Sequence, residues 1–300
     1  MPRLEIVSCL DSPALAAARR RELLIPRDVA AALGRSALQA ARDGHYTTDT
    51  GETVEWRAAV EAAIASKWSV PPDAVLPPPG DALFSATSVQ VSNETTLGAA
   101  RRLWDRGVRT LVLNFANGVH PGGGFLEGAR AQEEALCRSS ALYVTLVSDP
   151  MYDHHRQRPL PDATDWAILS PDVPVFRTDA GTPLGSPWPQ SFLTCAAPYA
   201  PAVGLARSGD LLHVRIGRAL AIARARGFTP LVLGAWGCGA FGNDPRRTAT
   251  SFREALEGPL AGAFRHVQFA VTDWSQERRT LGPFRDVFAA GGRRAMGGMQ

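Results

Sequence analysis

Two short runs of the sequence are apolar at every position, and they constrain the fold more than any other feature. Leu111–Leu113 and Leu231–Leu233 contain no polar residue. Successive side chains of a strand point to opposite faces of its sheet, so a continuously apolar strand is typical of a sheet covered by helices on both faces. The sequence therefore predicts an α/β fold: a mixed β-sheet flanked by helices.

Short β-rich runs alternate with helical patterns from Ser85 onward. The expected strands are Ser88–Val91, Thr110–Phe115, Trp166–Leu169, Val173–Arg177, Phe192–Ala196, Pro230–Leu233 and His266–Val271. The expected helices are Thr95–Arg106, Gln132–Leu146, Leu211–Arg226, Pro245–Leu256 and Pro283–Ala289.

The N-terminal part has a different pattern. Ser12–Asp43 is rich in Ala, Leu and Arg and predicts two helices, and Gly44–Trp56 suggests a short hairpin. The run Pro77–Gly80 then interrupts any regular structure. We expect an N-terminal, mainly helical extension over residues 1–80, a main domain over 81–290 and a flexible tail over 291–300.

Charge and cysteine content exclude several classes of protein. The formal net charge is +3, and no basic run exceeds Arg19–Arg21, so the chain lacks the basic stripe typical of duplex-DNA binding. No apolar run approaches the ~20 residues of a membrane-spanning helix. The four cysteines form no C-x-x-C pair and have no His at ligand spacing. We expect a cytoplasmic protein with reduced thiols, no metal, no cofactor, no membrane association and no stable protein partner.

Both apolar strands lead into glycine-rich loops, residues 114–125 and 234–245. Ligands of open α/β sheets bind outside the carboxyl ends of strands, and glycines there allow backbone N–H groups to surround phosphate oxygens. Neither loop fits the P-loop or dinucleotide-binding pattern, which disfavours a kinase, an ATPase or an NAD-dependent dehydrogenase. Asp244 followed by Pro245 predicts that the second loop opens a helix.

The chain places two acids at the start of the helix that follows the first loop. Gln132-Glu133-Glu134 follows Gly124 after seven intervening residues. Acids favour a helix N-terminus, so a purely structural interpretation is open. Their position beside three consecutive glycines favours a functional one. Neighbouring helical residues point about 100° apart, so the two glutamates suit two separate tasks better than one shared carboxylate pair.

The triple glycine Gly122–Gly124 followed by Gln132-Glu133-Glu134 resembles the signature of poly(ADP-ribose) glycohydrolases. The similarity to the bacterial type of this family continues in Ser170–Arg177, Gly234–Pro245 and Asp273-Trp274-Ser275. It covers roughly residues 85–289 and implies a catalytic domain with a macrodomain fold over 81–290.

The resemblance implies an enzyme that hydrolyses the ribose–ribose O-glycosidic bonds of poly(ADP-ribose), releasing ADP-ribose from the chain end without a metal. Glu134 matches the catalytic acid that protonates the leaving 2′ oxygen, and Glu133 matches the residue that holds the ribose hydroxyls together with Asn117. The bound diphosphate would stabilise an oxocarbenium ion. The implied ADP-ribose contacts are Asn117, Gly122, Gly123, Gly124, Phe125, Gln132, Gly237, Cys238, Gly239, Ala240 and Phe241.

Two alternatives remain open from the sequence. A macrodomain that binds ADP-ribose without hydrolysing it would share the glycine loops but would not need Glu134. A hydrolase that removes terminal ADP-ribose from protein or nucleic acid would keep the chemistry and change the acceptor.

Overall fold

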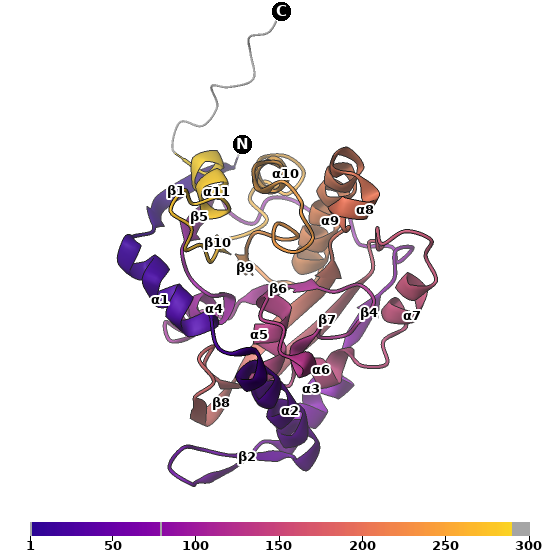
Figure 1. Cartoon of the computed structure of the whole chain (residues 1–300). Helices are drawn as coiled ribbons and strands as arrows, with labels where there is room; N and C mark the ends of the chain where they lie inside the picture. The colour runs from indigo at the N-terminus through magenta and orange to yellow at the C-terminus, as the bar shows by residue number, and fades with distance from the viewer. Residues whose placement is uncertain (1, 79, 290–300) are drawn as a thin grey trace, which may run out of the picture.

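A mixed eight-stranded sheet runs through the molecule in the order β1-β5-β10-β9-β6-β8-β7-β4 (Figure 1). The first six strands of this order are parallel, whereas β7 is antiparallel to β8 and β4 is antiparallel to β7. The computed structural model describes residues 2–78 and 80–289. The strands of the sheet are β1 (Arg3–Leu10), β4 (Trp68–Val70), β5 (Ala86–Ser92), β6 (Leu111–Ala116), β7 (Ala167–Arg177), β8 (Pro183–Ala196), β9 (Pro230–Leu233) and β10 (His266–Ala270).

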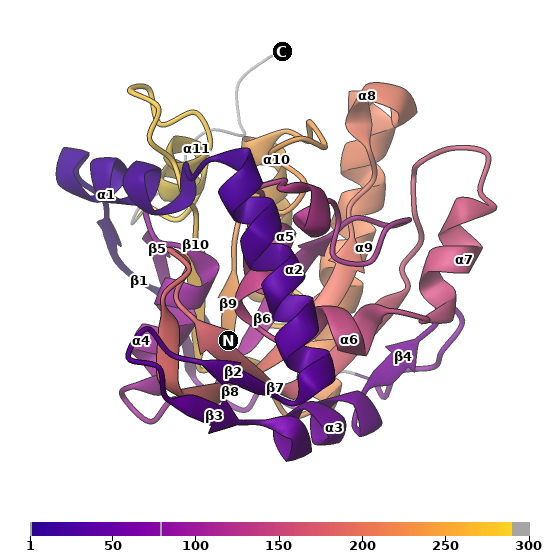
Figure 2. The ribbon, with the colours of Figure 1, turned by 60° about the horizontal axis from the view of Figure 1, so that its bottom comes forward.

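Helices cover both faces of the sheet (Figure 2). Helices α9 to α11 pack on one face, and α2 to α6 pack on the other. The helical elements are α1 (Pro13–Leu23), α2 (Arg27–Asp43), α3 (Arg57–Ala65), α4 (Thr96–Trp104), the 3₁₀ turn η1 (Phe125–Glu127), α5 (Gln132–Ser139), α6 (Leu142–Leu146), α7 (Pro150–Arg156), α8 (Ala200–Val203), α9 (Leu205–Ala225), α10 (Pro245–Glu257) and α11 (Leu281–Val287). A separate hairpin pairs β2 (His45–Thr47) with β3 (Thr53–Glu55).

The two apolar strands lie in the middle of the sheet, as the sequence predicts. In β6, Leu111 and Leu113 belong to the core beneath α9 and α10, while Val112 belongs to the core on the opposite face. In β9, Leu231 and Val232 divide in the same way. Each strand thus contributes apolar side chains to both cores, which confirms the predicted α/β sheet with helices on each side.

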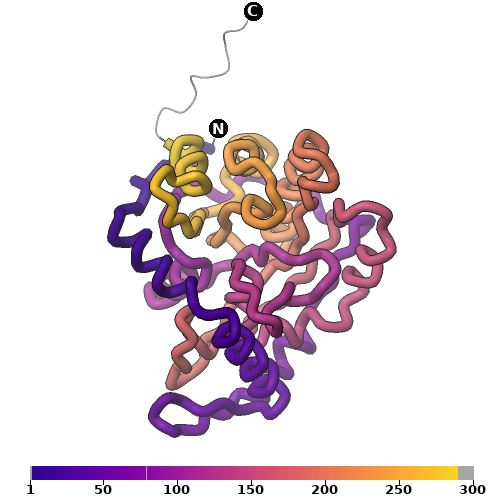
Figure 3. Tube along the Cα trace, in the orientation of Figure 1, coloured from indigo at the N-terminus to yellow at the C-terminus, as the bar shows by residue number. Residues whose placement is uncertain are grey.

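The prediction of a mainly helical N-terminal extension is wrong in one respect, because the chain begins with a strand. Strand β1 pairs in parallel with β5, and β4 pairs with β7, so residues before the Pro-rich break supply both outer strands of the main sheet. In Figure 3 the N-terminal segment also passes beside the first glycine loop, where α2 contacts η1 and α5. A domain boundary near residue 80 stays a prediction, and the predicted tail over 291–300 lies outside the described residues.

Two further expectations need correction. The helix predicted over Gln132–Leu146 is divided, because Ser140 adopts extended backbone and forms an isolated bridge with Val175. The two strands predicted between Trp166 and Arg177 form one strand, β7, whose pairing shifts at a bulge where Asp172 has a φ of 46°. In the described part of the chain, no helix is both long enough and apolar enough to cross a membrane.

Candidate active site

A cavity of about 460 Å³ opens at the carboxyl ends of β5, β10, β9 and β6. The loops after these strands form its walls: Thr95 follows β5, Trp274 follows β10, Gly239 follows β9 and Asn117 follows β6. Both apolar strands therefore deliver their glycine loops to one place, which is where ligands of open α/β sheets bind. The volume lies within the range of small-molecule sites.

Gln132 attaches the N-terminus of α5 to the middle of the sheet. Strand β6 pairs with β8 along its whole length but with β9 only over its first two residues, so on the β9 side the later residues of β6 have no strand partner among the described residues. The side-chain amide of Gln132 replaces that strand: Oε1 accepts from the N–H of Phe115 at 2.9 Å, and Nε2 donates to the carbonyl of Leu113 at 2.8 Å. Gln132 lines the cavity, but both ends of its amide bind the protein.

Glu133 is buried, and both of its oxygens bind the first glycine loop. Oε2 accepts from the N–H of Asn117 at 2.7 Å, and Oε1 accepts from the N–H of Gly122 at 3.2 Å. The amide of Asn114 adds a weak contact at 3.4 Å. Burial raises the pKa of Glu133 to about 8, with a further increase from the charge of Glu134, although the donated N–H groups act to lower it.

Glu134 is bound at one oxygen only. Oε1 accepts from the N–H of Gly124 at 3.1 Å, whereas Oε2 is buried and has no hydrogen-bond partner among the described residues. Glu134 also lines the cavity. A buried polar atom without a hydrogen-bond partner lowers the stability of the folded protein. At a cavity wall this loss of free energy is recovered when a ligand supplies the partner.

The triple glycine faces the two glutamates and does not line the cavity. The N–H groups of Gly122 and Gly124 bind Glu133 and Glu134, and the N–H of Gly123 binds the carbonyl of His120. Gly123 has a φ of +58°, and a Cβ atom built there would collide with Oε1 of Glu134. The close approach of the carboxylates explains Gly123, whereas a Cβ at Gly122 would collide with the rings of Phe125 and Tyr143 and one at Gly124 would press on Ala129. A direct contact between these glycines and a ligand stays a prediction.

The second glycine loop presents free backbone donors to the cavity. No described residue accepts a hydrogen bond from the N–H groups of Gly239, Ala240 or Phe241, and all three residues line the cavity. Consecutive N–H groups of this kind form an anion-binding concavity. As predicted, Asp244 caps the following helix, accepting from the N–H of Arg247 at 2.8 Å, and Pro245 begins α10.

The remaining predicted contacts differ in their exposure to the cavity. Gly237 and Phe241 line it, and the Phe241 ring meets Tyr199 edge-on. Phe125 is fully buried beneath Gly122 and does not line the cavity, so its ring is part of the hydrophobic core. Cys238 points away toward Thr248, and burial raises the pKa of its thiol to about 12, which does not suit a nucleophile.

Several residues that line the cavity or hold its loops were not predicted from the sequence. The second loop is held by the buried Asn243, whose amide donates to the carbonyl of Pro198 at 2.9 Å and contacts the carbonyl of Gly237 at 3.2 Å. His155 is buried in α7 and binds the carbonyl of Gly118. Short polar side chains and buried histidines carry no sequence signal by themselves. The cavity residues outside the predicted set include Leu23, Glu94, Thr95, Thr96, Arg130, Asp179, Thr272, Trp274 and Thr280.

The described residues contain no group of three or more His, Cys, Asp or Glu side chains arranged to hold a metal ion. Glu133, Glu134 and residues 239–241 of the second loop line the cavity, together with the ionisable side chains of Glu94, Arg130 and Asp179. A carboxylic acid beside an anion-binding loop at the carboxyl end of an α/β sheet defines an enzyme site for an anionic substrate.

Comparison with known proteins identifies the family. Residues 34–178 match the microbial-type PARG catalytic domain. The crystal structure of poly(ADP-ribose) glycohydrolase from Thermomonospora curvata is 39% identical, with a TM-score of 0.79, and the match covers 86% of this chain and 98% of that chain. The enzyme from Deinococcus radiodurans in complex with ADP-ribose is 41% identical, with a TM-score of 0.70 and coverage of 77% and 97%. The chain matches none of the curated proteins.

The chain belongs to the microbial-type poly(ADP-ribose) glycohydrolase family. A second structure from Thermomonospora curvata, 41% identical, contains the inhibitor ADP-HPD. The resemblance inferred from the glycine and glutamate motifs is thereby confirmed, as is the classification of the protein as a glycohydrolase-type enzyme.

The position of Glu134 predicts a severe effect of a single methyl group at Gly123. In Gly123→Ala, the positive φ and the collision with Oε1 force the loop or the carboxylate to move. A misplacement of about 1 Å can cost about 100-fold in rate, and we expect a loss of that size. The measurement is release of ADP-ribose from poly(ADP-ribose). Gly217→Ala in α9, where a Cβ meets no atom within 4 Å, is the control. Wild-type turnover in Gly123→Ala contradicts the proposed fit.

The raised pKa of Glu133 predicts a pH dependence of stability. The folded protein retains the Glu133 proton up to about pH 8, whereas the unfolded chain releases it near the ordinary value of 4.5. The folded state then binds more protons between these values, so the free energy of unfolding should fall as pH rises through this window. Glu133→Gln has no proton to lose there. Denaturant titrations should show the free energy of unfolding of wild type falling relative to that of this variant from about pH 5 to 8. If the free energies of the two proteins change with pH in parallel, the raised pKa is refuted.

Proposed function

We propose that the protein hydrolyses the ribose–ribose O-glycosidic bond at the end of a poly(ADP-ribose) chain and releases ADP-ribose, with Glu134 as the general acid. The observation that carries the proposal is the asymmetry of Glu134. One oxygen is fixed by the N–H of Gly124, and the other has no partner among the described residues at the wall of the cavity. Membership of the family and the relative that binds ADP-ribose support the substrate class.

The second loop is suited to the diphosphate of ADP-ribose. The free N–H groups of Gly239, Ala240 and Phe241 provide three consecutive backbone donors. A Cβ atom at Gly239 would meet nothing within 4 Å, so the surface in front of it is open. Backbone donors fixed by the fold bind phosphate oxygens with no reorganisation of long side chains.

The distal ribose then lies between the loop and α5. Glu133 and Asn117 line the cavity next to Glu134, and we assign them to the ribose hydroxyls. Each oxygen of Glu133 accepts an N–H from the loop, and a carboxylate oxygen has a second lone pair for a hydroxyl. The Phe241 ring packs on the ribose and limits the access of water.

The reaction proceeds in two steps at the anomeric carbon of the distal ribose. Protonated Glu134 transfers its proton to the leaving 2′ oxygen as the glycosidic C–O bond breaks and its electron pair moves to that oxygen. The anomeric carbon becomes an oxocarbenium ion, which the neighbouring diphosphate stabilises by its negative charge. A water molecule then adds to this carbon and transfers a proton to the Glu134 carboxylate, which restores the acid.

The size of the cavity supports cleavage at the chain end. A volume of about 460 Å³ is that of a site for one small ligand, which suits a single terminal ADP-ribose unit. A module that only binds ADP-ribose would gain nothing from an unpartnered carboxylate oxygen at the cavity wall, because such an atom weakens the site until it is used.

The substitution Glu134→Gln tests the catalytic assignment. General acid catalysis contributes about 10²–10⁴-fold, so turnover should fall by at least about 100-fold. Glutamine has the same shape and lacks the acid proton, so ADP-ribose should still bind. Glu133→Gln should bind ADP-ribose more weakly, because the ribose and the first loop lose their anchor.

The assay measures ADP-ribose released from poly(ADP-ribose) and from singly ADP-ribosylated protein, with ADP-ribose affinity measured by calorimetry. Release from the polymer by wild type supports the proposal, whereas release from the modified protein alone shows a different acceptor. Binding by wild type with no release from either substrate shows a binding module. Wild-type turnover by Glu134→Gln excludes Glu134 as the acid.

Removal of divalent ions tests the metal-free mechanism. The proposed steps use only Glu134 and the bound diphosphate, so wild-type turnover should be the same, within about twofold, before and after dialysis against EDTA. The comparison is made at equal ionic strength, because phosphate binding by the second loop is sensitive to salt. A loss of activity that a divalent ion restores would contradict the mechanism.

A further inference from the structure

One wall of the cavity is the loop between β10 and α11. Val271, Thr272, Trp274 and Thr280 line the cavity from this loop. Trp274 keeps 41% of its surface exposed, although an indole normally buries a large apolar area. An exposed indole at the wall of a ligand cavity offers a face on which part of a ligand can stack.

Asp273 folds this loop into a fixed shape. One oxygen, Oδ1, accepts from the N–H of Ser275 at 2.8 Å and from its hydroxyl at 2.6 Å. The other, Oδ2, accepts from the N–H groups of Thr280 at 2.8 Å and Leu281 at 3.0 Å, so it closes the loop onto the start of α11. Trp274 therefore sits in a turn whose conformation is set by one carboxylate.

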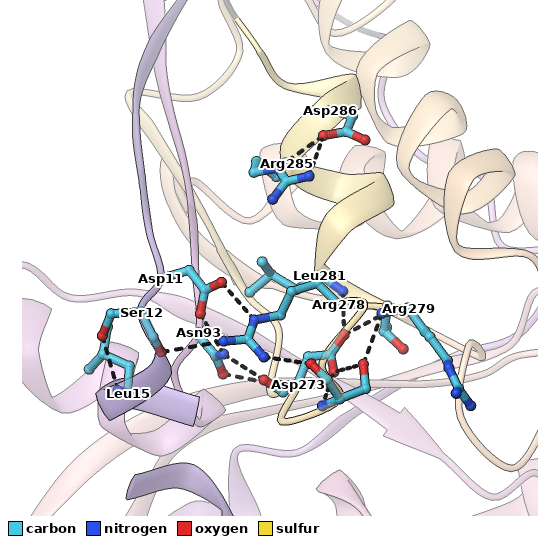
Figure 4. A network of polar contacts seen from close by, with 12 residues as sticks. Asp11, Ser12, Leu15, Asn93, Asp273, Arg278, Arg279, Leu281, Arg285 and Asp286 are labelled. Atoms are coloured by element: carbon cyan, nitrogen blue, oxygen red, sulfur yellow. Dashed lines mark hydrogen bonds and ion pairs between the residues drawn. The ribbon is translucent and has the colours of Figure 1, made fainter. Parts of the chain in front are cut away.

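The loop is attached to the N-terminal segment through Arg278 (Figure 4). Arg278 donates from Nε to Oδ2 of Asp11 at 2.7 Å and from Nη1 to the carbonyl of Ser275 at 2.5 Å. A longer contact from Nη2 reaches the carbonyl of Ser12 at 3.4 Å, at the junction of β1 and α1. The Arg278 and Asp11 side chains are 14% and 17% exposed, so solvent screens the pair only in part.

Asn93 ties the same junction to the other end of the loop. Its amide donates to Oδ1 of Asp11 at 2.9 Å and to the carbonyl of Asp273 at 2.6 Å, and its Oδ1 accepts from the N–H of Asp273 at 3.1 Å. Asp11 therefore contacts both Arg278, which belongs to the loop, and Asn93, which binds the backbone of Asp273 in the loop. These hydrogen bonds attach the loop to the residues that follow β1 and β5, as well as to the start of α11.

Arg278 adopts a backbone conformation that a side chain normally avoids. Its φ is 53°, in the left-handed region that favours glycine. Such a residue persists where its surroundings determine its position, and these residues concentrate at functional sites. Here the surroundings that determine it are Asp11, Ser12 and Ser275.

We propose that Arg278 and Asp11 are positioning residues for substrate binding, which hold the Trp274 loop against the cavity. The N-terminal strand thus contributes to ligand affinity through a contact between residues 267 positions apart in the chain. The identity of the ligand, ADP-ribose, rests on the proposed function. Glu134 belongs to α5, so loss of the Arg278 contact should weaken binding and leave the chemical step largely intact.

The first test compares substrate binding with turnover. Arg278→Met and Asp11→Asn should raise the Kd for ADP-ribose and the KM for poly(ADP-ribose) about tenfold, which corresponds to ~1.4 kcal/mol, with kcat changed less than about threefold. Arg278→Lys keeps the charge and should recover part of the affinity. Arg158→Met is the matched control, because Arg158 also pairs with an aspartate at 2.7 Å, and its side-chain contacts among the described residues are to Asp162, not to the Trp274 loop.

The second test asks whether Arg278 acts through Trp274. Trp274→Ala alone should weaken ADP-ribose binding, and combination with Arg278→Met should produce no further loss, because the positioned group is already absent. Losses that multiply in the double variant would overturn the proposal. An unchanged Kd in folded Arg278→Met and Asp11→Asn proteins would also overturn it.

The third test needs no ligand. Hydrogen exchange at the amides of Ser275, Thr280 and Leu281 should be faster in Arg278→Met than in wild type or Arg158→Met. If wild type binds ADP-ribose but releases none from polymer, the proposed function fails while the affinity test of Arg278 stands. If wild type does not bind ADP-ribose, the exchange rates decide whether Arg278 holds the loop, and unchanged rates refute it.

Discussion

The geometry of the site depends on the contact between two carboxylates and the backbone of a glycine loop. In the first turn of α5, Glu133 accepts hydrogen bonds from the N–H groups of Asn117 and Gly122. Glu134 accepts one from the N–H of Gly124. A Cβ atom at Gly123 would collide with Oε1 of Glu134, so this position of the loop requires glycine. The same contact holds one oxygen of Glu134, while the other has no hydrogen-bond partner among the described residues.

The sheet brings this contact to the second loop. Parallel strands β6 and β9 end at the same edge, so the loops that follow them face a common cavity. Gln132 completes the arrangement, since its amide replaces a missing strand beside β6 and places the start of α5 over the strand ends. Gln132 thus fixes Glu134 against the sheet and Asn243 fixes the second loop, which favours a preorganised site.

Much of this arrangement could be predicted from the sequence, because its signals are local. Continuous apolar runs indicated the central strands, and the spacing from the triple glycine to Glu133 and Glu134 indicated the loop and helix. Long-range pairings carry no such signal. The sequence did not predict that β1 joins β5, that the glycine N–H groups bind the glutamates, or that Arg278 reaches Asp11. Phosphate binding was the natural expectation for both glycine loops, but among the described residues the N–H groups of the triple glycine are bound within the protein, whereas those of Gly239, Ala240 and Phe241 in the cavity lining have no acceptor.

A crystal structure of the wild-type protein with ADP-ribose would test the central claim most directly. The account predicts the diphosphate on the N–H groups of Gly239–Phe241 and the anomeric hydroxyl of the distal ribose within about 3.2 Å of Oε2 of Glu134. In that complex the carboxylate oxygen that lacks a partner in the protein acquires one from the ligand. A ribose turned away from Glu134, with the diphosphate bound elsewhere, would contradict both the assignment of the acid and the role of the second loop.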